Sequence, residues 1–153
     1  MVSLDIRPIT LADITDITAI DKEVQSVPWS YNVFLKALSS HAIGKVIELD
    51  SVVVGFYVCT ESRTDLHLAN LSVKEALQKV GLGTSLLEDV IAYGKEEGFE
   101  TVSLNVNERN TRAISLYHKH GFVKVGRQRC YYFMGEDIQE QHALNYTKTL
   151  REN

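Results

Sequence analysis

The feature that most constrains this chain is a glycine-punctuated loop between an apolar strand and a long amphipathic helix. The strand reads L-H-L-A-N-L-S-V over residues 66–73, and the loop after it carries Gln78, Gly81 and Gly83 in the pattern Q-x-x-G-x-G. Glycine has no Cβ, so backbone N–H groups here can approach a ligand closely. A helix N-terminus also presents N–H groups without intrahelical acceptors and a partial positive charge. The pattern therefore predicts a phosphate or pyrophosphate site at this helix N-terminus.

Two common nucleotide-binding loops do not fit this stretch. It lacks the G-x-x-x-x-G-K-[ST] pattern of a P-loop, and it lacks G-x-G-x-x-G with the acidic residue that would bind a ribose. Two glycines this close together can also serve tight packing between a helix and a strand. The loop by itself leaves both interpretations open.

A second motif begins about thirty residues after the loop and reads N-x-x-A-I-x-L-Y-x-x-x-G-F. Its members are Asn110, Ala113, Ile114, Leu116, Tyr117, Gly121 and Phe122. Together the two motifs resemble the GCN5-related N-acetyltransferase (GNAT) superfamily, from about Leu4 to Leu150 and most specifically over 66–122. Within it, Pro28–Ser30 and the Tyr131–Tyr132 pair resemble the bacterial ribosomal-protein-alanine N-acetyltransferase (RimI) branch.

The resemblance implies an α/β fold, the acyl-CoA N-acyltransferase fold, with a mixed central sheet flanked by helices. We expect a single domain over residues 1–153, with the cofactor-binding core at about 66–122. Alternation and helical periodicity predict the individual elements. Strands are expected at Leu4–Pro8, Ile43–Leu49, Val52–Thr60, Leu66–Val73, Phe99–Val106, Phe122–Arg127 and His142–Leu150, and helices after Thr10–Asp13, after Ser30, at 81–97 and from Asn110 to Gly121.

Two further stretches carry structural expectations. Gly55 stands in the middle of a predicted strand, which indicates a bulge or a close backbone approach. The polar, acidic stretch Tyr131–Gln141 reads as a linker that could form a mobile lip over the substrate.

Composition narrows the class of partner. The chain has 153 residues, enough for one substantial core, and no apolar run approaches the ~20 residues that span a bilayer. Two cysteines, Cys59 and Cys130, are too few for a disulfide scaffold, so we expect a reducing cytoplasm. The net charge of −4 argues against nucleic acid as a main partner and suits a cationic acceptor. We expect no membrane association, and a monomer or a homodimer.

The resemblance assigns acetyl-CoA, as cosubstrate, to the strand and the loop. It implies that Leu71, Ser72 and Val73 bind the pantetheine arm. The residues implied to bind the pyrophosphate are Gln78, Lys79, Val80, Gly81, Leu82, Gly83 and Thr84. Asn110 resembles the asparagine that contacts the pantetheine arm, although a helix N-cap would also explain it. Tyr117 resembles the general acid that protonates the departing thiolate at the cofactor site, although a buried aromatic would have the same spacing.

The proton acceptor is where this sequence departs from its closest branch. That branch carries a glutamate in L-E-V, whereas the matching triplet here is Leu104-Asn105-Val106. A neutral amide is no base, but Asn105 can hold a water or a substrate carbonyl. His67, Glu108 and Asp65 are the other candidates, and histidine titrates in the useful range. Without a carboxylate at 105, the enzyme would depend on the acidity of its amine unless His67 or another group substitutes.

Three functions remain open at this point. The first is acetyl transfer to a protein N-terminal amine, with an alanine as first candidate. The second is transfer to a small amine such as a polyamine, an amino acid or an antibiotic. The third is a CoA-binding regulator without catalysis, which Asn105 favours and Tyr117 opposes. No metal site is expected, because no Cys/His cluster has ligand spacing, and neither cysteine has an evident histidine partner for nucleophilic catalysis.

Overall fold

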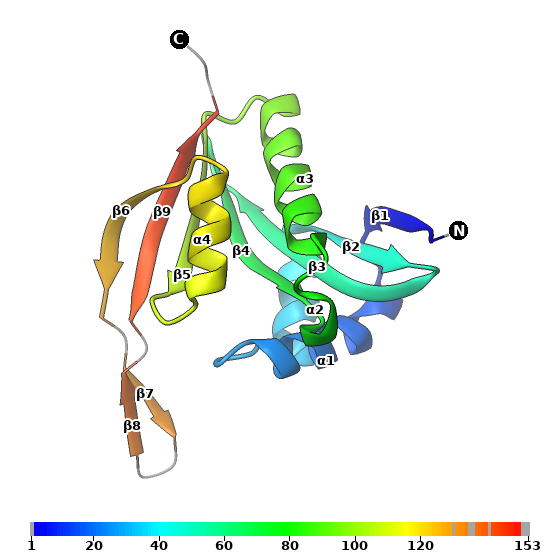
Figure 1. The fold of residues 1–153 in the computed structure, drawn as a ribbon, viewed down its shortest axis with the longest axis horizontal. Coiled ribbons are helices and arrows are strands. Elements are labelled where there is room, and N and C mark those ends of the chain that lie inside the picture. The colour runs from blue at the N-terminus through cyan, green and yellow to red at the C-terminus, as the bar shows by residue number, and fades with distance from the viewer. Residues whose placement is uncertain (1, 130, 135–136, 141, 151–153) are drawn as a thin grey trace.

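A seven-stranded mixed sheet forms the centre of the molecule, in the order β1-β2-β3-β4-β5-β9-β6 (Figure 1). The computed structural model describes residues 2–129, 131–134, 137–140 and 142–150. The strands are β1 (Leu4–Pro8), β2 (Ile43–Leu49), β3 (Val52–Glu61), β4 (Asp65–Val73), β5 (Thr101–Asn107), β6 (Val123–Gln128) and β9 (Ala143–Thr149). Among these described strands, β4 and β5 are the parallel pair. The predicted α/β fold is confirmed.

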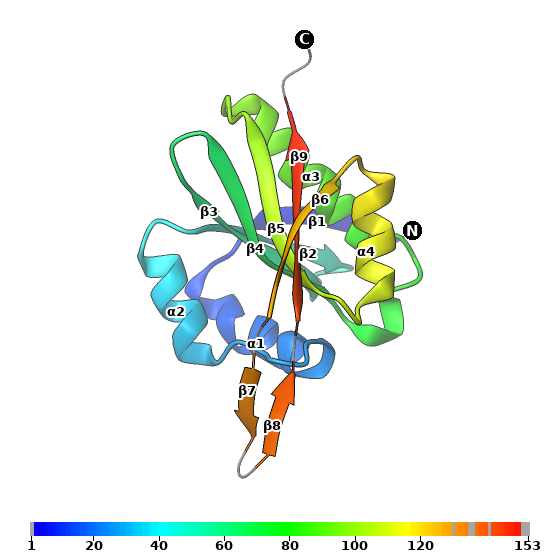
Figure 2. The ribbon, with the colours of Figure 1, turned by 90° about the vertical axis from the view of Figure 1, so that its left-hand side faces the viewer.

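Helices cover both faces of the sheet (Figures 1 and 2). One face carries α3 (Leu82–Glu96) and α4 (Thr111–Lys119), and the other carries α1 (Ile14–Val24) and α2 (Tyr31–Ser39). Each helix buries an apolar stripe at helical spacing. In α3 this stripe includes Leu86 and Val90, and in α1 it includes Ile14 and Ile17, all 0% exposed. Each such side chain contributes about 1.5–3 kcal/mol of burial free energy.

Most local signals in the sequence act as expected. Ser30 Oγ accepts the Val33 N–H at 3.3 Å and caps α2, and the Asp13 carboxylate accepts the Thr10 N–H at 2.7 Å. A Cβ at Gly55 would lie only 3.0 Å from the carbonyl oxygen of Ser72, so the predicted close approach is confirmed. A 3₁₀ turn over Leu11–Asp13 precedes α1, so the first helix starts later than its capping residues indicate.

In the C-terminal part, β6 and β9 form an antiparallel pair, and β9 also pairs along all of β5, so it lies between β5 and β6. The stretch Tyr131–Gln141, predicted to be a linker, contains an antiparallel hairpin of β7 (Tyr131–Met134) and β8 (Asp137–Glu140). Aromatic residues such as the Tyr131–Tyr132 pair favour strands. Cys130 and Gln141 lie outside the described residues.

The functionally important feature is a wedge between β4 and β5. These strands pair only from Asp65–Leu68 to Thr101–Leu104. After Leu68, one residue of β4 is bulged against β3, because Leu68 lies opposite Cys59 while Asn70 lies opposite Val58. Beyond this point β4 follows β3 and β5 follows β9. The facing edges of β4 and β5 are therefore left without a ladder partner, with backbone groups available to a ligand.

Candidate active site

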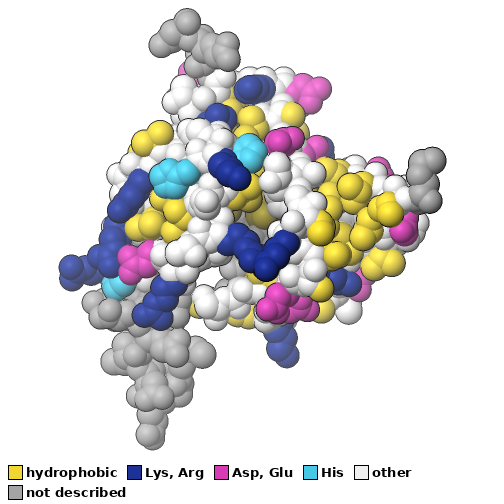
Figure 3. Space-filling model, in the orientation of Figure 1, with side chains coloured by type: hydrophobic (Ala, Val, Ile, Leu, Met, Phe, Trp, Pro, Cys, Tyr) yellow, Lys and Arg dark blue, Asp and Glu magenta, His cyan; other side chains and the backbone are white. Residues whose placement is uncertain are grey.

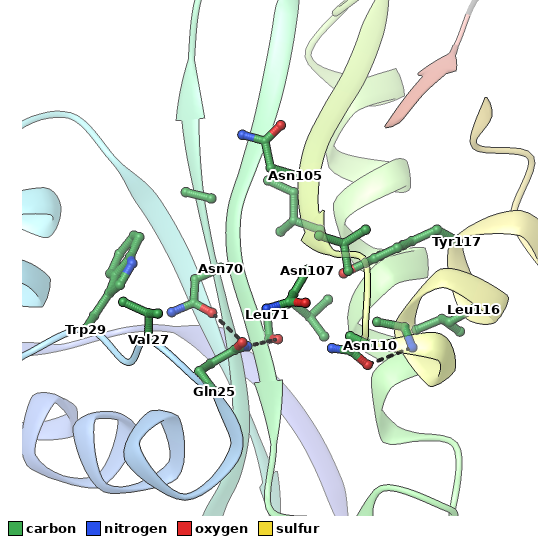
Figure 4. A pocket seen from close by; sticks show the side chains of 14 residues that line it. Gln25, Val27, Trp29, Asn70, Leu71, Asn105, Asn107, Asn110, Leu116 and Tyr117 are labelled. Atoms are coloured by element: carbon green, nitrogen blue, oxygen red, sulfur yellow. Dashed lines mark hydrogen bonds between the residues drawn. The ribbon is translucent and has the colours of Figure 1, made fainter. Parts of the chain in front are cut away.

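A cavity of about 290 Å³ occupies the open end of this wedge (Figure 4). Its walls come from the segment after α1, from β4 and β5, and from α4. They include Gln25, Trp29, Asn70, Leu71, Asn105 and Tyr117. A second hollow of about 150 Å³ shares Gln25 and Leu71 with the first and reaches Gly81, Gly83 and Thr84. The site is thus a continuous cleft from the glycine loop at one end to Trp29 at the other.

The glycine loop ends in an open helix N-terminus. Gly81 is the N-cap of α3 with φ of +88°, a conformation that favours glycine, and no side chain caps this end. A Cβ at Gly81 would meet nothing within 4 Å, so the space beside it is open to a ligand. The N–H groups of Leu82, Gly83 and Thr84 have no intrahelical acceptors. Three donors and a helix dipole converge there, which is a donor set that fits a pyrophosphate.

Side chains around the loop have separate roles. The Leu82 side chain is buried in the core, so only its backbone faces the loop, whereas Lys79 and Val80 are exposed. Gln78 Nε2 donates to the Val73 carbonyl at 3.2 Å, and its Oε1 accepts from Arg112 Nη1 at 2.9 Å. Figure 3 shows Lys and Arg side chains gathered beside the lower end of α4 and along the outer side of β6. This positive charge would attract an anionic ligand.

The edge of β4 that faces the wedge offers backbone groups. The carbonyl oxygens of Leu71 and Val73 point there, because Gln25 Nε2 lies 3.4 Å from the first and Gln78 reaches the second. The carbonyl oxygen of Ser72 instead lies beside Gly55 of β3, and the Ser72 hydroxyl bonds to Asp21. Of the three predicted strand residues, Leu71 and Val73 therefore present backbone groups to the cleft. These fit the amides of a pantetheine arm.

Two residues of the second motif meet at the cleft. Asn110 Oδ1 accepts the Ala113 N–H at 3.2 Å, so it caps α4, and it also lines the cleft. Its Nδ2 remains available to a ligand. Tyr117 is 7% exposed, and its hydroxyl points from α4 into the space between β4 and β5 (Figure 4). Burial raises the pKa of Tyr117 to about 12.

The predicted base candidates are dispersed. Asn105 lines the cavity, and its Oδ1 accepts a hydrogen bond from Asn145, so its NH₂ group is left to face a ligand. Glu108 pairs with Arg127 at 2.9 Å, which holds the pKa of Glu108 below its usual range and weakens it as a base. His67 lies on β4 where the wedge is still closed, next to the lining residue Leu68. Among the described lining residues of the cavity, Tyr117 is the one ionisable group.

Sequence reasoning missed Gln25 and a buried anchor beneath it. Asp21, on α1, is 0% exposed, and its carboxylate accepts from the Trp29 N–H at 2.8 Å, from Asn70 Nδ2 at 3.1 Å and from Ser72 Oγ at 3.0 Å. Burial raises the pKa of Asp21. This carboxylate fastens the segment after α1 to β4. Trp29 packs on Phe34 and also lines the cavity.

Comparison with known proteins decides the family. A family model described as "Acetyltransferase (GNAT) family" matches residues 11–122. The chain belongs to this family. This GNAT protein is accordingly an acetyl-CoA-dependent N-acetyltransferase, and the resemblance seen in its two motifs is confirmed.

Individual relatives agree with the family. An N-alpha-acetyltransferase of Sulfolobus acidocaldarius is 30% identical over 151 residues, covering 89% of each chain. A [ribosomal protein bS18]-alanine N-acetyltransferase of Haemophilus influenzae is 28% identical over 127 residues, covering 83% of this chain and 86% of the relative. The crystal structure of the ribosomal-protein-S18-alanine N-acetyltransferase from Escherichia coli superposes with a TM-score of 0.88 at 22% identity, covering 99% and 96%. This structural likeness shows the shared fold.

Two other kinds of feature are absent from the described part of the chain. None of its helices has the length and apolar composition that crossing a membrane requires. No three His, Cys, Asp or Glu side chains within it are grouped so as to hold a metal ion.

Proposed function

We propose that this GNAT enzyme acetylates the α-amine of a polypeptide N-terminus, with alanine as the first candidate residue. The observation that carries the proposal is the cleft itself. It joins an anion-binding helix N-terminus to a cavity whose far end is open at Trp29 and whose described lining holds no carboxylate. The names of the relatives from Sulfolobus acidocaldarius and Haemophilus influenzae support the same acceptor class.

In this proposal acetyl-CoA supplies an acetyl group activated as a thioester. The N–H groups of Leu82, Gly83 and Thr84 hold the pyrophosphate, while Leu71 and Val73 pair with the pantetheine amides through their backbone. Asn110 contributes its Nδ2 to the same arm. Positioning of this kind is a large part of catalysis, because it converts an encounter between two molecules into a step within one complex.

Three side chains act on protons and polar atoms. Tyr117 gives its proton to the departing sulfur, and a pKa of about 12 keeps the phenol protonated across the working range. Asn105 holds a water or the acceptor's first carbonyl with its NH₂ group, because its oxygen is bonded to Asn145. His67 takes the acceptor's proton through a water.

The choice of an α-amine follows from the missing carboxylate. An α-amine has a pKa of about 7.7–8.0 and a lysine about 10.4, so neutralising them at pH 7 costs about 1.2 and about 4.6 kcal/mol. A site without a strong base tolerates the smaller cost more readily. A polypeptide is favoured over a small amine because Val27 lines the cavity and is 45% exposed, which offers apolar surface to the residues that follow the N-terminus.

Thiol release from acetyl-CoA tests the proposal. The acceptors are a hexapeptide beginning with alanine, the same peptide with an acetylated N-terminus, a polyamine and a free amino acid. We expect turnover with the first alone. Turnover with the polyamine or amino acid only would assign the enzyme to small amines, and tight CoA binding without turnover would make it a regulator. We also propose a cytoplasmic location, as the cysteine content suggests.

A further inference from the structure

Three side chains form a hydrogen-bonded chain next to the cavity, where β4 and β5 still pair. Asp65 and His67 lie on β4, and Ser103 lies on β5 directly opposite His67. Ser103 Oγ is 2.5 Å from Asp65 Oδ2 and 2.8 Å from His67 Nδ1. Thr101 Oγ1 donates to the other oxygen of the same carboxylate at 2.7 Å. The carboxylate is therefore held on both oxygens, and its link to the imidazole runs through one hydroxyl.

The protons in this chain can be counted. An ionised carboxylate accepts hydrogen bonds and donates none, so Ser103 gives its single hydroxyl proton to Asp65. The Ser103 oxygen then offers a lone pair to His67, and Nδ1 must carry the proton that fills this bond. A neutral imidazole has one N–H, so Nε2 of His67 is left as a free proton acceptor. The hydrogen bond made by one ring nitrogen commonly determines in this way which of the two nitrogens carries the proton.

We propose that Asp65 and Ser103 are positioning residues that hold His67 in its Nδ1–H tautomer, so that Nε2 receives the proton of the acceptor amine. This inference rests on the proposed function. An N–H bond of the acceptor's ammonium group breaks, the proton passes through a water to Nε2, and the electron pair stays on the amine nitrogen. The imidazolium that forms keeps its bond to Ser103 and faces the negative charge of Asp65.

In this proposal one water lies between the acceptor amine and Nε2. Leu68, the residue after His67, lines the cavity. Asn105 also lines it and lies two residues beyond Ser103 on the same sheet face, roughly 7 Å along the strand. A water held by the Asn105 NH₂ group would bridge that gap between the amine and the imidazole. The missing glutamate at 105 is thus replaced by a base on the neighbouring strand.

The charge that acts on His67 comes from Asp65. On this face β3 presents Thr60 opposite His67, and β9 presents Thr147 opposite Ser103. Both are neutral, as is Thr101. Among the described side chains of β3, β4, β5 and β9 that surround the ring on this face, Asp65 is therefore the charged one.

Nitrogen-15 NMR of the imidazole ring tests the tautomer without any activity. The resonance of His67 is identified by its loss in His67→Gln. In the neutral ring of the wild type, we expect the proton on Nδ1. Ser103→Thr keeps the hydroxyl and should keep this tautomer, whereas Ser103→Ala should lose it. Thr101→Val is the matched control, because it removes a hydroxyl from Asp65 without touching His67, and the tautomer should persist.

Kinetics then test the consequence. Ser103→Ala should lower kcat by about 10-fold, by analogy with the lower cost of removing the hydrogen-bond partner of a metal-bound histidine. It should leave the KM for acetyl-CoA unchanged, while Ser103→Thr restores kcat. An Nε2–H tautomer in the wild type, or a wild-type kcat in Ser103→Ala, overturns the proposal. If the tautomer is Nδ1–H but no amine is acetylated, the proposed function fails and the orientation of His67 stands.

Discussion

Tyr117 and Phe122 pack edge to face, with ring centroids 5.7 Å apart and planes at 61°. This contact joins the α4 helix to the start of β6 and fixes the phenol ring. The hydroxyl at the other end of the ring points into the cleft (Figure 4). The ring of Tyr117 thus belongs to the core and its hydroxyl to the site. Its contributions to stability and to catalysis can therefore be separated by mutation.

Tyr117→Phe should abolish most of the activity without loosening the fold. The variant keeps the ring that packs on Phe122 and removes the proton that Tyr117 gives to the departing sulfur. General acid catalysis is worth ~10²–10⁴-fold, so kcat should fall on that scale with little change in acetyl-CoA affinity. Single-turnover kinetics and calorimetry measure the two quantities. A fall of less than about threefold, with chemistry rate-limiting, would return Tyr117 to a purely structural role.

Tyr57→Phe is a suitable control for that experiment. Tyr57 is 0% exposed and donates to Asp89 at 2.7 Å, but it lines neither hollow of the cleft. The Tyr57→Phe variant should lose some stability because it lacks this hydrogen bond, but its kcat should be unchanged. Equal losses of kcat in the two variants would point to a general effect on the fold.

Gly81→Val tests the anion site at the start of α3. A Cβ at this position meets no protein atom within 4 Å, so the added side chain points into the space assigned to the pyrophosphate. Gly98 offers a matched control, because its φ is +81° against +88° and its added Cβ would also meet nothing. Both substitutions should cost roughly 1–2 kcal/mol of stability from the left-handed backbone. Only Gly81→Val should lose acetyl-CoA binding in calorimetry. Equal affinities of the two variants would show that acetyl-CoA does not bind at this loop.

Local signals explain what could be predicted. The capping residue Ser30, the β-branched strand that leads into Asn105, and the glycine after α3 act within a few residues of themselves, so their patterns are readable in the sequence. The apolar stripes of α1 and α3 likewise predict which faces are buried. Tyr117 and the loop glycines are assigned to the site because they lie in motifs of fixed spacing.

Long-range contacts explain what could not be predicted. Gln25 reaches Leu71 across 46 positions, and Asp21 reaches Asn70 and Ser72 across 49 and 51. No local pattern encodes such pairs, because either partner would read as an ordinary polar residue of its own element. The insertion of β9 between β5 and β6 is also non-local. The departure at Asn105 was visible, but the alternative chain through Ser103 needed the strand register.

Loss of the Arg7–Asp13 ion pair should account for part of the stability that the protein loses at acid pH. Arg7 Nη1 and Nη2 lie 2.8 and 2.9 Å from the Asp13 oxygens, and this guanidinium lowers the pKa of Asp13 to about 2. The unfolded chain has a carboxyl pKa of about 3.9. The stabilisation is therefore complete above about pH 4 and is lost as the pH falls through 2. Asp13→Asn should lower the free energy of unfolding by about 2 kcal/mol at pH 7, and by less at each step from pH 4 to 2.

Urea unfolding at several pH values measures this difference. Asp16→Asn is the control, since Asp16 is an exposed acid in the first turn of α1 and should have a small effect. Asp21 acts in the opposite direction, because burial raises its pKa and the folded state binds its proton more tightly. The contribution of Asp21 is the same in the wild type and in Asp13→Asn, so it cancels in the difference between them. A difference that stays constant down to pH 2 would exclude the Arg7–Asp13 pair as its source.

The preference for an α-amine over a lysine side chain can be measured within one peptide sequence. One version has a free N-terminus and an acetylated lysine, and the other has the reverse. At pH 7 roughly one α-amine in ten is neutral, against fewer than one lysine in a thousand. The difference of about 3.4 kcal/mol predicts kcat/KM about 300-fold higher for the α-amine, because the cleft has no carboxylate near Asn105 to offset it. Asn105→Glu should narrow this ratio by supplying such a base. A lysine acetylated as fast as the α-amine by the wild type would mean that a stronger base than His67 serves the site.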